Sequence, residues 1–397
     1  MAPQTDSTFP HPPEGASSNG AHGLLDASPG PLHPAALLTW QSALDVAWAD
    51  VTSRHGAGRR SRALLDRARA VIADGLGVRP DEVTFHASGD QAARTALTGL
   101  SRGRRRRTGA PVAGAVEHSG LLRWLRAGET APIEAPVSPT GAIDLDSWRD
   151  AITGETPFAV LQSANQEVGT RQPLAAAREV TTALGVPLLA DVRAGAGRDA
   201  VPIDFDVLVA DATTWGGPRL GILVVRTGTR FSPHHPPTPH EGGHALDPVD
   251  VPTALAAAEA WQQVAATREA DAHEARQLIE QIRSAARRIP DVDVVGDPVD
   301  RLAHVCTFSV LYVDGETLVD ELARLGLSVA SGSACTSDTM EPSHVLAAMG
   351  ALTQGNVRIT LPLAAVSPGR AADVERLCTV LPQVVSSARE RLGIKDL

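Results

Sequence analysis

The sequence predicts an α/β protein with a mostly parallel sheet, and two observations carry this prediction. Short apolar runs alternate along the chain with stretches that have helical periodicity. These runs are continuously apolar, as in strands that are covered on both faces by helices. They lie at 83–85, 112–116, 158–163, 186–190, 206–210 and 221–225. In such a sheet, ligands bind at the carboxyl ends of the strands.

The helical segments are recognised by the spacing of their apolar residues. Residues 61–75 place apolar side chains on one helical face, with Ser61 as the expected N-cap and Gly75 or Gly77 as the expected stop. A long helix rich in Ala and Glu is expected over about 253–286. A Pro- and His-rich stretch at 231–240 interrupts the pattern before it.

These elements predict the domain organisation. Residues 1–22 are rich in Pro, Ser, Gly and His without periodicity, so we expect a disordered tail. A large domain with the parallel sheet is expected over 23–260, followed by a small C-terminal α+β domain over 261–397. Residues 23–40 could pack with the small domain.

Composition and charge indicate a soluble cytoplasmic protein. The 397 residues are 43% hydrophobic, with no apolar run of transmembrane length and no signal-peptide pattern at the start. Three unevenly spaced cysteines argue against a disulfide framework. The net charge of -10 argues against nucleic-acid binding, and no membrane partner is expected. We interpret the arginine run 102–107 as a solvated loop, with an anionic docking site as the alternative.

Several segments match one enzyme family in order and spacing, from Gly23 to Glu375. They are LLDASPGPLHPAAL (24–37), HGAGRRSRALLDRARAVIADGLGVRPDEVTF (55–85), AVEHSGLL (115–122), NQEVGTRQPL (165–174), LLADVRAGAG (188–197), GGPRLGILVVR (216–226), SGSACTSDTMEPSHVLAAMG (331–350) and NVRITL (356–361). Together they resemble the cysteine desulfurase (NifS-type) branch of the class V aminotransferases, which are fold type I pyridoxal phosphate (PLP) enzymes. The resemblance implies a PLP-transferase-like fold, PLP as the family cofactor, and a homodimer in which each site borrows a loop from its neighbour.

Five residues match functional positions of that family. The resemblance assigns Asp191 to the pyridinium nitrogen of the cofactor, Asn165 to its ring hydroxyl, and His118 to ring stacking and proton transfer. It assigns Arg358 to the substrate carboxylate, and Cys335, in a Ser- and Gly-flanked loop, to sulfur transfer. Two alternatives stay open, because Asp191 can cap a turn and His118 can be a structural histidine.

Other family positions are altered, and all of them concern the cofactor. Thr214 stands where the lysine that bonds PLP is expected, and the only lysine of the chain is Lys395. Thr213 and Ala194 replace a histidine and a glutamine. Asp90 and Asp211 replace neutral residues of the phosphate site, where Asp90 can cap a helix N-terminus instead.

These changes predict an acidic, amine-free cavity in which covalent PLP attachment is excluded and PLP binding is doubtful. Each carboxylate in contact with the phosphate would cost roughly 4 kcal/mol at an effective dielectric near 20. A micromolar site is worth only about 8 kcal/mol in total. The repulsion therefore decides against the cofactor unless the site is rearranged.

Three functions remain open from the sequence. The favoured one is a non-catalytic protein, a pseudoenzyme or sulfur relay in which Cys335 accepts a persulfide, as a homodimer or as a heterodimer with a true desulfurase. The second is an active cysteine desulfurase or lyase that holds PLP without a covalent bond. The third is a zinc hydrolase that uses the HEGGH motif at 240–244, although two glycines in it disfavour the required helix. No metal ligand is assigned.

Overall fold

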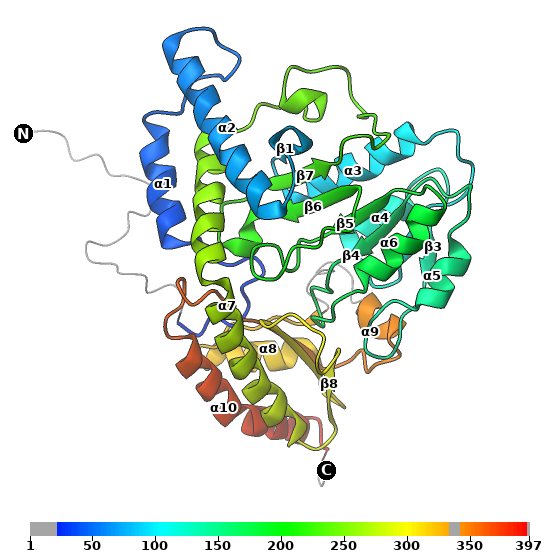
Figure 1. Ribbon diagram of the computed structural model, residues 1–397. Coiled ribbons are helices and arrows are strands. Elements are labelled where there is room, and N and C mark those ends of the chain that lie inside the picture. The colour runs from blue at the N-terminus through cyan, green and yellow to red at the C-terminus, as the bar shows by residue number, and fades with distance from the viewer. Residues whose placement is uncertain (1–21, 333–341, 395–397) are drawn as a thin grey trace, which may run out of the picture.

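The large sheet forms the centre of the molecule. The computed structural model describes residues 22–332 and 342–394 (Figure 1). Within these, seven strands form a sheet in the order β1-β7-β6-β5-β4-β2-β3. The strands are β1 (Val83–His86), β2 (Val112–Gly114), β3 (Ile133–Ala135), β4 (Ala159–Gln162), β5 (Leu188–Asp191), β6 (Val207–Asp211) and β7 (Gly221–Val225). Pairing from β3 through β6 is parallel, and only β7 runs against its two neighbours.

Helices cover both faces of this sheet, which confirms the predicted α/β class. One face packs on α3 (Gly89–Gly103) and α4 (Ser119–Arg126). The other packs on α1 (Pro34–Leu44), α2 (Gly56–Leu76), α5 (Leu145–Ala151), α6 (Leu174–Ala183) and α7 (Val251–Arg287). Every residue of β1, β4 and β5 is buried, because these strands have a helix layer on each side.

A smaller three-stranded antiparallel sheet lies below the large one (Figure 1). Its strands are β8 (Val292–Val295), β9 (Val305–Val310) and β10 (Asn356–Thr360), and its helices are α8 (Gly315–Arg324), α9 (His344–Ala348) and α10 (Arg370–Arg391). The end of α7 contributes to this second core. Residue 260, the predicted domain boundary, falls inside the continuous helix α7.

The N-terminal segment joins the two parts. Leu25 is fully buried in the core of the small domain, and Asp26 bridges to Thr360 in β10. The next helix, α1, packs against α7 beside the large sheet. The tail predicted at residues 1–22 lies outside the described residues, apart from His22.

The predicted start of α2 was wrong. The helix begins at Gly56, and the N-cap is His55, whose Nδ1 accepts from the backbone N–H of Gly58 at 3.2 Å. Ser61 is fully buried inside the helix. The stop at Gly77 is confirmed, because Gly77 adopts the left-handed conformation with φ 65°.

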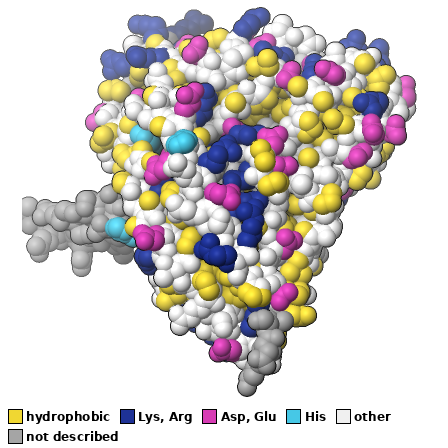
Figure 2. All heavy atoms as spheres, turned by 60° about the horizontal axis from the view of Figure 1, so that its bottom comes forward, with side chains coloured by type: hydrophobic (Ala, Val, Ile, Leu, Met, Phe, Trp, Pro, Cys, Tyr) yellow, Lys and Arg dark blue, Asp and Glu magenta, His cyan; other side chains and the backbone are white. Residues whose placement is uncertain are grey.

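The surface is rich in arginine despite the net charge of -10. Figure 2 shows basic side chains gathered in a column down the middle of one face, with acidic side chains scattered around them. All of these basic side chains are arginines, because Lys395 lies outside the described residues. Among the described residues, no helix is long and apolar enough to span a membrane. The prediction of no nucleic-acid partner stays a prediction.

Candidate functional site

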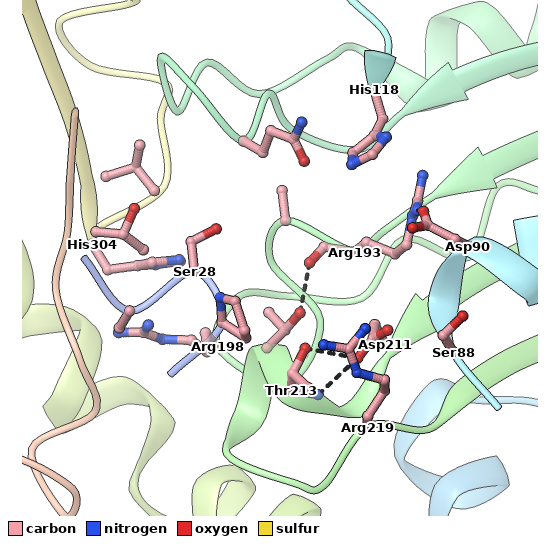
Figure 3. Close-up of a pocket in the computed structure, with 17 residues that line it drawn as sticks. Ser28, Ser88, Asp90, His118, Arg193, Arg198, Asp211, Thr213, Arg219 and His304 are labelled. Carbon is pink, nitrogen blue, oxygen red and sulfur yellow. Dashed lines mark hydrogen bonds and ion pairs between the residues drawn. The ribbon is translucent and has the colours of Figure 1, made fainter. Parts of the chain in front are cut away.

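A pocket of about 210 Å³ opens where several strands of the large sheet end (Figure 3). The loops that follow β1, β2, β5 and β6 form one wall, because parallel strands bring their carboxyl ends to a common edge. The N-terminal segment and the small domain form the opposite wall. The lining residues are Ala27, Ser28, Pro29, Ser88, Asp90, His118, Gln166, Arg193, Ala194, Arg198, Asp211, Thr213, Thr214, Arg219, His304, Val305 and Thr360.

Arg193 holds the carboxylate at the end of β5. Its Nη2 lies 2.6 Å from Asp191 Oδ2, and its Nε donates to Asp191 Oδ1 at 2.9 Å. Its Nη1 reaches Asp90 Oδ1 at 2.5 Å, so one guanidinium bridges two carboxylates. Figure 3 shows Arg193 beside Asp90. The side chains of Asp191 and Arg193 are 4% and 10% exposed, so this ion pair is shielded from water.

The protonation of this pair follows from its surroundings. Burial raises the pKa of Asp191, but the charge and hydrogen bonds of Arg193 outweigh it, and the pKa lies below the ordinary value. Burial lowers the pKa of Arg193, but the charges and hydrogen bonds of Asp191 and Asp90 together raise it by more than burial lowers it, so the net shift is upward. Both groups are therefore charged at neutral pH.

Asp211 occupies the helix terminus at which the resemblance would place a phosphate. Its Oδ2 accepts from the N–H of Gly89, the first residue of α3, at 2.7 Å. Its Oδ1 accepts from the N–H and the hydroxyl of Thr213 at 3.0 and 2.7 Å. Asp90 does not cap the helix as predicted, because Ser88 is the N-cap and Asp90 pairs with Arg193.

The pocket is not the purely acidic cavity that the sequence predicted. Guanidinium groups of Arg193, Arg198 and Arg219 line it together with Asp90 and Asp211. The prediction was wrong because it rested on the lost lysine and the two added carboxylates, and it did not consider the arginines of the neighbouring loops. The signal that could have revealed Arg193 is its place two residues after a strand-end aspartate, within reach of that carboxylate.

These residues do not fit PLP in its family position. The carboxylate expected to bind the pyridinium nitrogen is engaged by Arg193 through both oxygens. The helix N–H expected to bind phosphate already binds the carboxylate of Asp211. Packing is tight as well, since a Cβ at Gly89 would lie 2.8 Å from both Arg193 Cδ and Asp211 Cβ. Thr214 uses its hydroxyl to donate to the Arg193 carbonyl at 2.6 Å.

His118 and Asn165 differ in how they relate to the pocket. His118 lines it, and its Nδ1 accepts from the N–H of Gly120 at 3.0 Å, which caps α4. Burial, followed by the charge of Arg193, lowers the pKa of His118 to about 4. Asn165 is 1% exposed and does not line the pocket. Its amide is used within its own loop and to Val116, while Gln166 faces the cavity.

Arg358 lies apart from this pocket, and the other predicted residue cannot be placed. Arg358 is buried in β10 and forms an ion pair with Asp26 at 3.5 Å, and it is not among the lining residues. Cys335 lies outside the described residues. Cys306 is fully buried in β9, where burial raises the pKa of its thiol to about 11. Burial also raises the pKa of the half-buried Cys378.

The HEGGH motif has a structural role. Glu241 accepts from both terminal nitrogens of Arg69 at 2.7 and 2.8 Å, and from the N–H of Phe85 at 2.7 Å. The motif forms a short 3-10 turn (η4, Glu241–Gly243) in place of the α-helix that zinc hydrolases need. Within the described residues, no group of three metal-ligating side chains comes together. Glu241 is therefore not placed to activate a metal-bound water.

The family assignment follows from comparisons over nearly the whole chain. The class V aminotransferase family model matches residues 24–226 and 247–377. An IscS-like cysteine desulfurase of Mycobacterium tuberculosis is 32% identical over 394 residues, covering 92% of this chain and 96% of that protein. A cysteine desulfurase of Cereibacter sphaeroides is 30% identical over 373 residues, covering 90% and 94%.

A solved structure agrees with these sequence matches. A NifS-like protein superposes with a TM-score of 0.82 at 20% identity, covering 92% of this chain and 99% of its own. At that identity the superposition shows the fold alone, which is the predicted fold type I arrangement. The chain belongs to the class V aminotransferase family, on its cysteine desulfurase-like branch, whose cofactor is PLP.

Proposed function

We propose that this protein is a non-catalytic member of the desulfurase branch, which keeps the fold and dispenses with PLP. The observation that carries this proposal is the position of Arg193. Its guanidinium neutralises Asp191 and Asp90, the two carboxylates nearest to it, and Asp211 takes the helix N–H of Gly89. Arg193 thus takes the place of the pyridinium cation beside Asp191, and the carboxylate of Asp211 takes the place of the phosphate at the N–H of Gly89.

Electrostatics favour this internal arrangement over the cofactor. For PLP to enter, Arg193 must leave a buried carboxylate to which it makes several hydrogen bonds. Removing one partner of a buried ion pair typically costs about 3–5 kcal/mol. That cost is a large part of the roughly 8 kcal/mol that a micromolar cofactor site provides.

The proposed role for such a protein is sulfur relay through Cys335. The Cys335 thiolate attacks the outer sulfur of a persulfide on a donor desulfurase. A new S–S bond forms on Cys335, the donor S–S bond breaks, and the donor cysteine leaves as a thiolate, with no external oxidant. The proposal includes a cytoplasmic location, where thiols stay reduced, and a homodimer or a heterodimer with an active desulfurase.

One feature of the pocket favours an alternative. His118 lines the pocket and is poised as a neutral imidazole, since its pKa is about 4. Together with Asp191 it would suit an active enzyme that holds PLP without a covalent bond. That enzyme would require Arg193 to swing away from Asp191 on binding.

A sulfide-release assay and a sulfur-transfer assay distinguish the sulfur relay from the PLP-dependent enzyme. We expect the purified protein, incubated with PLP and cysteine, to release no sulfide above a protein-free control. After exposure to a persulfide-loaded desulfurase, mass spectrometry should find one extra sulfur on Cys335. The matched control is Cys378→Ser, which removes a half-buried thiol and should still accept sulfur, whereas Cys335→Ser should not. Sulfide release that depends on Cys335 would favour the enzyme, and sulfur found only on Cys306 or Cys378 would exclude the relay.

A further inference from the structure

A dense group of arginines lies at the end of α3, away from the pocket. Five of them fall within 102–107, and a sixth comes from the segment after β7. We call this group the arginine patch, and its members are Arg102, Arg104, Arg105, Arg106, Arg107 and Arg230. Because α3 has 15 residues and each adds about 1.5 Å, the patch lies about 20 Å from Asp90 in the pocket wall. Figure 1 shows α3 ending at the edge of the large domain.

The structure brings Arg230 beside the end of α3. The N–H of Ser232 donates to a carbonyl of α3 at 3.0 Å. Gly103 has no room for a Cβ, which would overlap with the carbonyl of Arg230. Burial, followed by the charges of Arg107 and Arg230, lowers the pKa of Arg104, so these three guanidinium groups are near one another. Arg230 therefore extends the run at 102–107 into one surface.

Carboxylates do not neutralise the arginine patch. Among the described residues, none of its six arginines forms an ion pair. The neighbouring Asp206 is bound by Arg178 through both of its oxygens. Glu155 accepts from the N–H and the hydroxyl of Thr108 at 3.4 and 3.3 Å. The patch therefore keeps its positive charge on the folded surface.

Local structure accounts for only two of the six cations. Arg102 lies in the last turn of α3, where the helix dipole favours a positive charge, and it contacts His234 Nδ1 at 3.2 Å. Arg104 donates to the carbonyl of Gly185. The other four have no side-chain hydrogen bond or ion pair within the part of the chain that the structure describes. Since like charges repel, such a concentration favours the approach of an anion.

The charge of the remaining chain selects the kind of anion. The net charge of -10 includes the six arginines, so the rest of the chain carries -16 (-10 - 6). DNA or RNA would extend beyond the patch and meet this negative remainder. The patch also contains no aromatic side chain on which bases could stack. A short acidic peptide segment covers the patch alone and avoids the repulsion.

We propose that the arginine patch is a docking surface for an acidic segment of a partner protein, a stretch rich in Asp and Glu. Guanidinium groups bind carboxylates through two parallel hydrogen bonds, which suits several arginines facing one such stretch. Surface ion pairs are individually weak, so we expect a dissociation constant on the order of 0.1 mM. The proposal does not depend on the proposed function, because the patch lies apart from the pocket.

The test measures binding of a fluorescently labelled octapeptide of glutamate by anisotropy. Full-length protein without PLP is titrated into the peptide at low ionic strength. We expect saturable binding by the wild type. Raising the ionic strength from about 0.05 M to about 0.5 M should weaken it about tenfold or more, because salt screens exposed charges.

A triple variant tests whether the patch is the binding surface. Arg105→Gln, Arg106→Gln and Arg230→Gln together remove three exposed charges that have no partner within the described residues. Loss of half of the charges should weaken peptide binding about tenfold. Circular dichroism checks that the variant is folded, and the salt titration of the wild type tests the proposal without any variant.

The matched control removes the same charge elsewhere. Arg59→Gln, Arg60→Gln and Arg67→Gln change three exposed arginines of α2, which covers the other face of the sheet from α3. This variant has the same net charge as the patch variant. It should change peptide binding by less than about twofold, because charges beyond the Debye length are screened.

Three other outcomes contradict the proposal. They are no saturable binding of the peptide, equal weakening by the two triple variants, and tighter binding of other anions than of the peptide. The other anions are an oligothymidylate of the same charge and vesicles that contain phosphatidylserine, which would identify the patch as a nucleic-acid or membrane surface. The titration involves neither PLP nor sulfur, so its failure leaves the proposed function standing, and the reverse also holds.

Discussion

Replacement of Arg193 by alanine is expected to lower the free energy of unfolding by about 3–5 kcal/mol, because it leaves a buried carboxylate without its cation. Asp191 is 4% exposed on its side chain and takes several hydrogen bonds from Arg193. Denaturant unfolding at neutral pH, followed by circular dichroism, measures the effect.

The control is an exposed ion pair of the same chemistry. Arg79 and Asp81 also form an ion pair, but their side chains are 61% and 62% exposed. Arg79→Ala should therefore cost about 1 kcal/mol or less. Equal losses for the two variants would show that Arg193 has no special role in the pocket.

The pH dependence of this effect has a definite sign. In the wild type the folded pKa of Asp191 is lowered, so its contribution to stability is present above the ordinary pKa and lost as pH falls through the folded pKa. Without the guanidinium of Arg193, burial becomes the dominant influence on Asp191 and raises its pKa, although the backbone N–H of residue 193 still donates to this carboxylate, so the carboxylate takes up a proton more readily. The stability gap between wild type and Arg193→Ala should consequently be wider at pH 7 than at pH 5.

Removal of the three charged side chains that occupy the expected cofactor position should allow PLP to bind. Arg193→Ala, Asp211→Ser and Asp90→Ala together free Asp191 and remove two charges that would face the phosphate. Each such contact costs roughly 4 kcal/mol at a dielectric near 20. Allowing for screening by water, we expect PLP affinity to rise by about a hundredfold or more, measured by equilibrium dialysis.

Thr214→Lys tests whether PLP fails to bind because the lysine is absent or because Arg193 and Asp211 occupy its site. Introduced alone, it should leave PLP binding weak, because Arg193 and Asp211 still occupy the site. Added to the three charge changes, it should make the cofactor resistant to dialysis after borohydride reduction. Tight binding by the single Thr214→Lys variant would contradict the account, since it would show that only the lysine was missing.

The fold was largely predictable from the sequence. Continuous apolar runs marked β1, β4, β5, β6 and β7, because a strand buried on both faces has no polar alternation. The start of α2 was missed because a histidine at position 55 caps it, and histidine is outside the usual capping set.

The site was predictable in part. The family resemblance pointed to Asp191, His118 and Thr214, and the structure brings His118 and Thr214 to the same pocket as Arg193, which holds Asp191. The position of Arg193 two residues after Asp191 made it a candidate partner, but the sequence does not give the direction of its side chain from the following turn. Arg193 and Arg198 were therefore missed, although they set the charge of the pocket.

A crystal structure of the wild-type protein grown with millimolar PLP tests the central claim most directly. The account predicts that Arg193 still bridges Asp191 and Asp90, that Asp211 still accepts from Gly89, and that no PLP lies between them. Density for the PLP ring against Asp191, with its phosphate at the N–H of Gly89 and Arg193 displaced, would contradict the account.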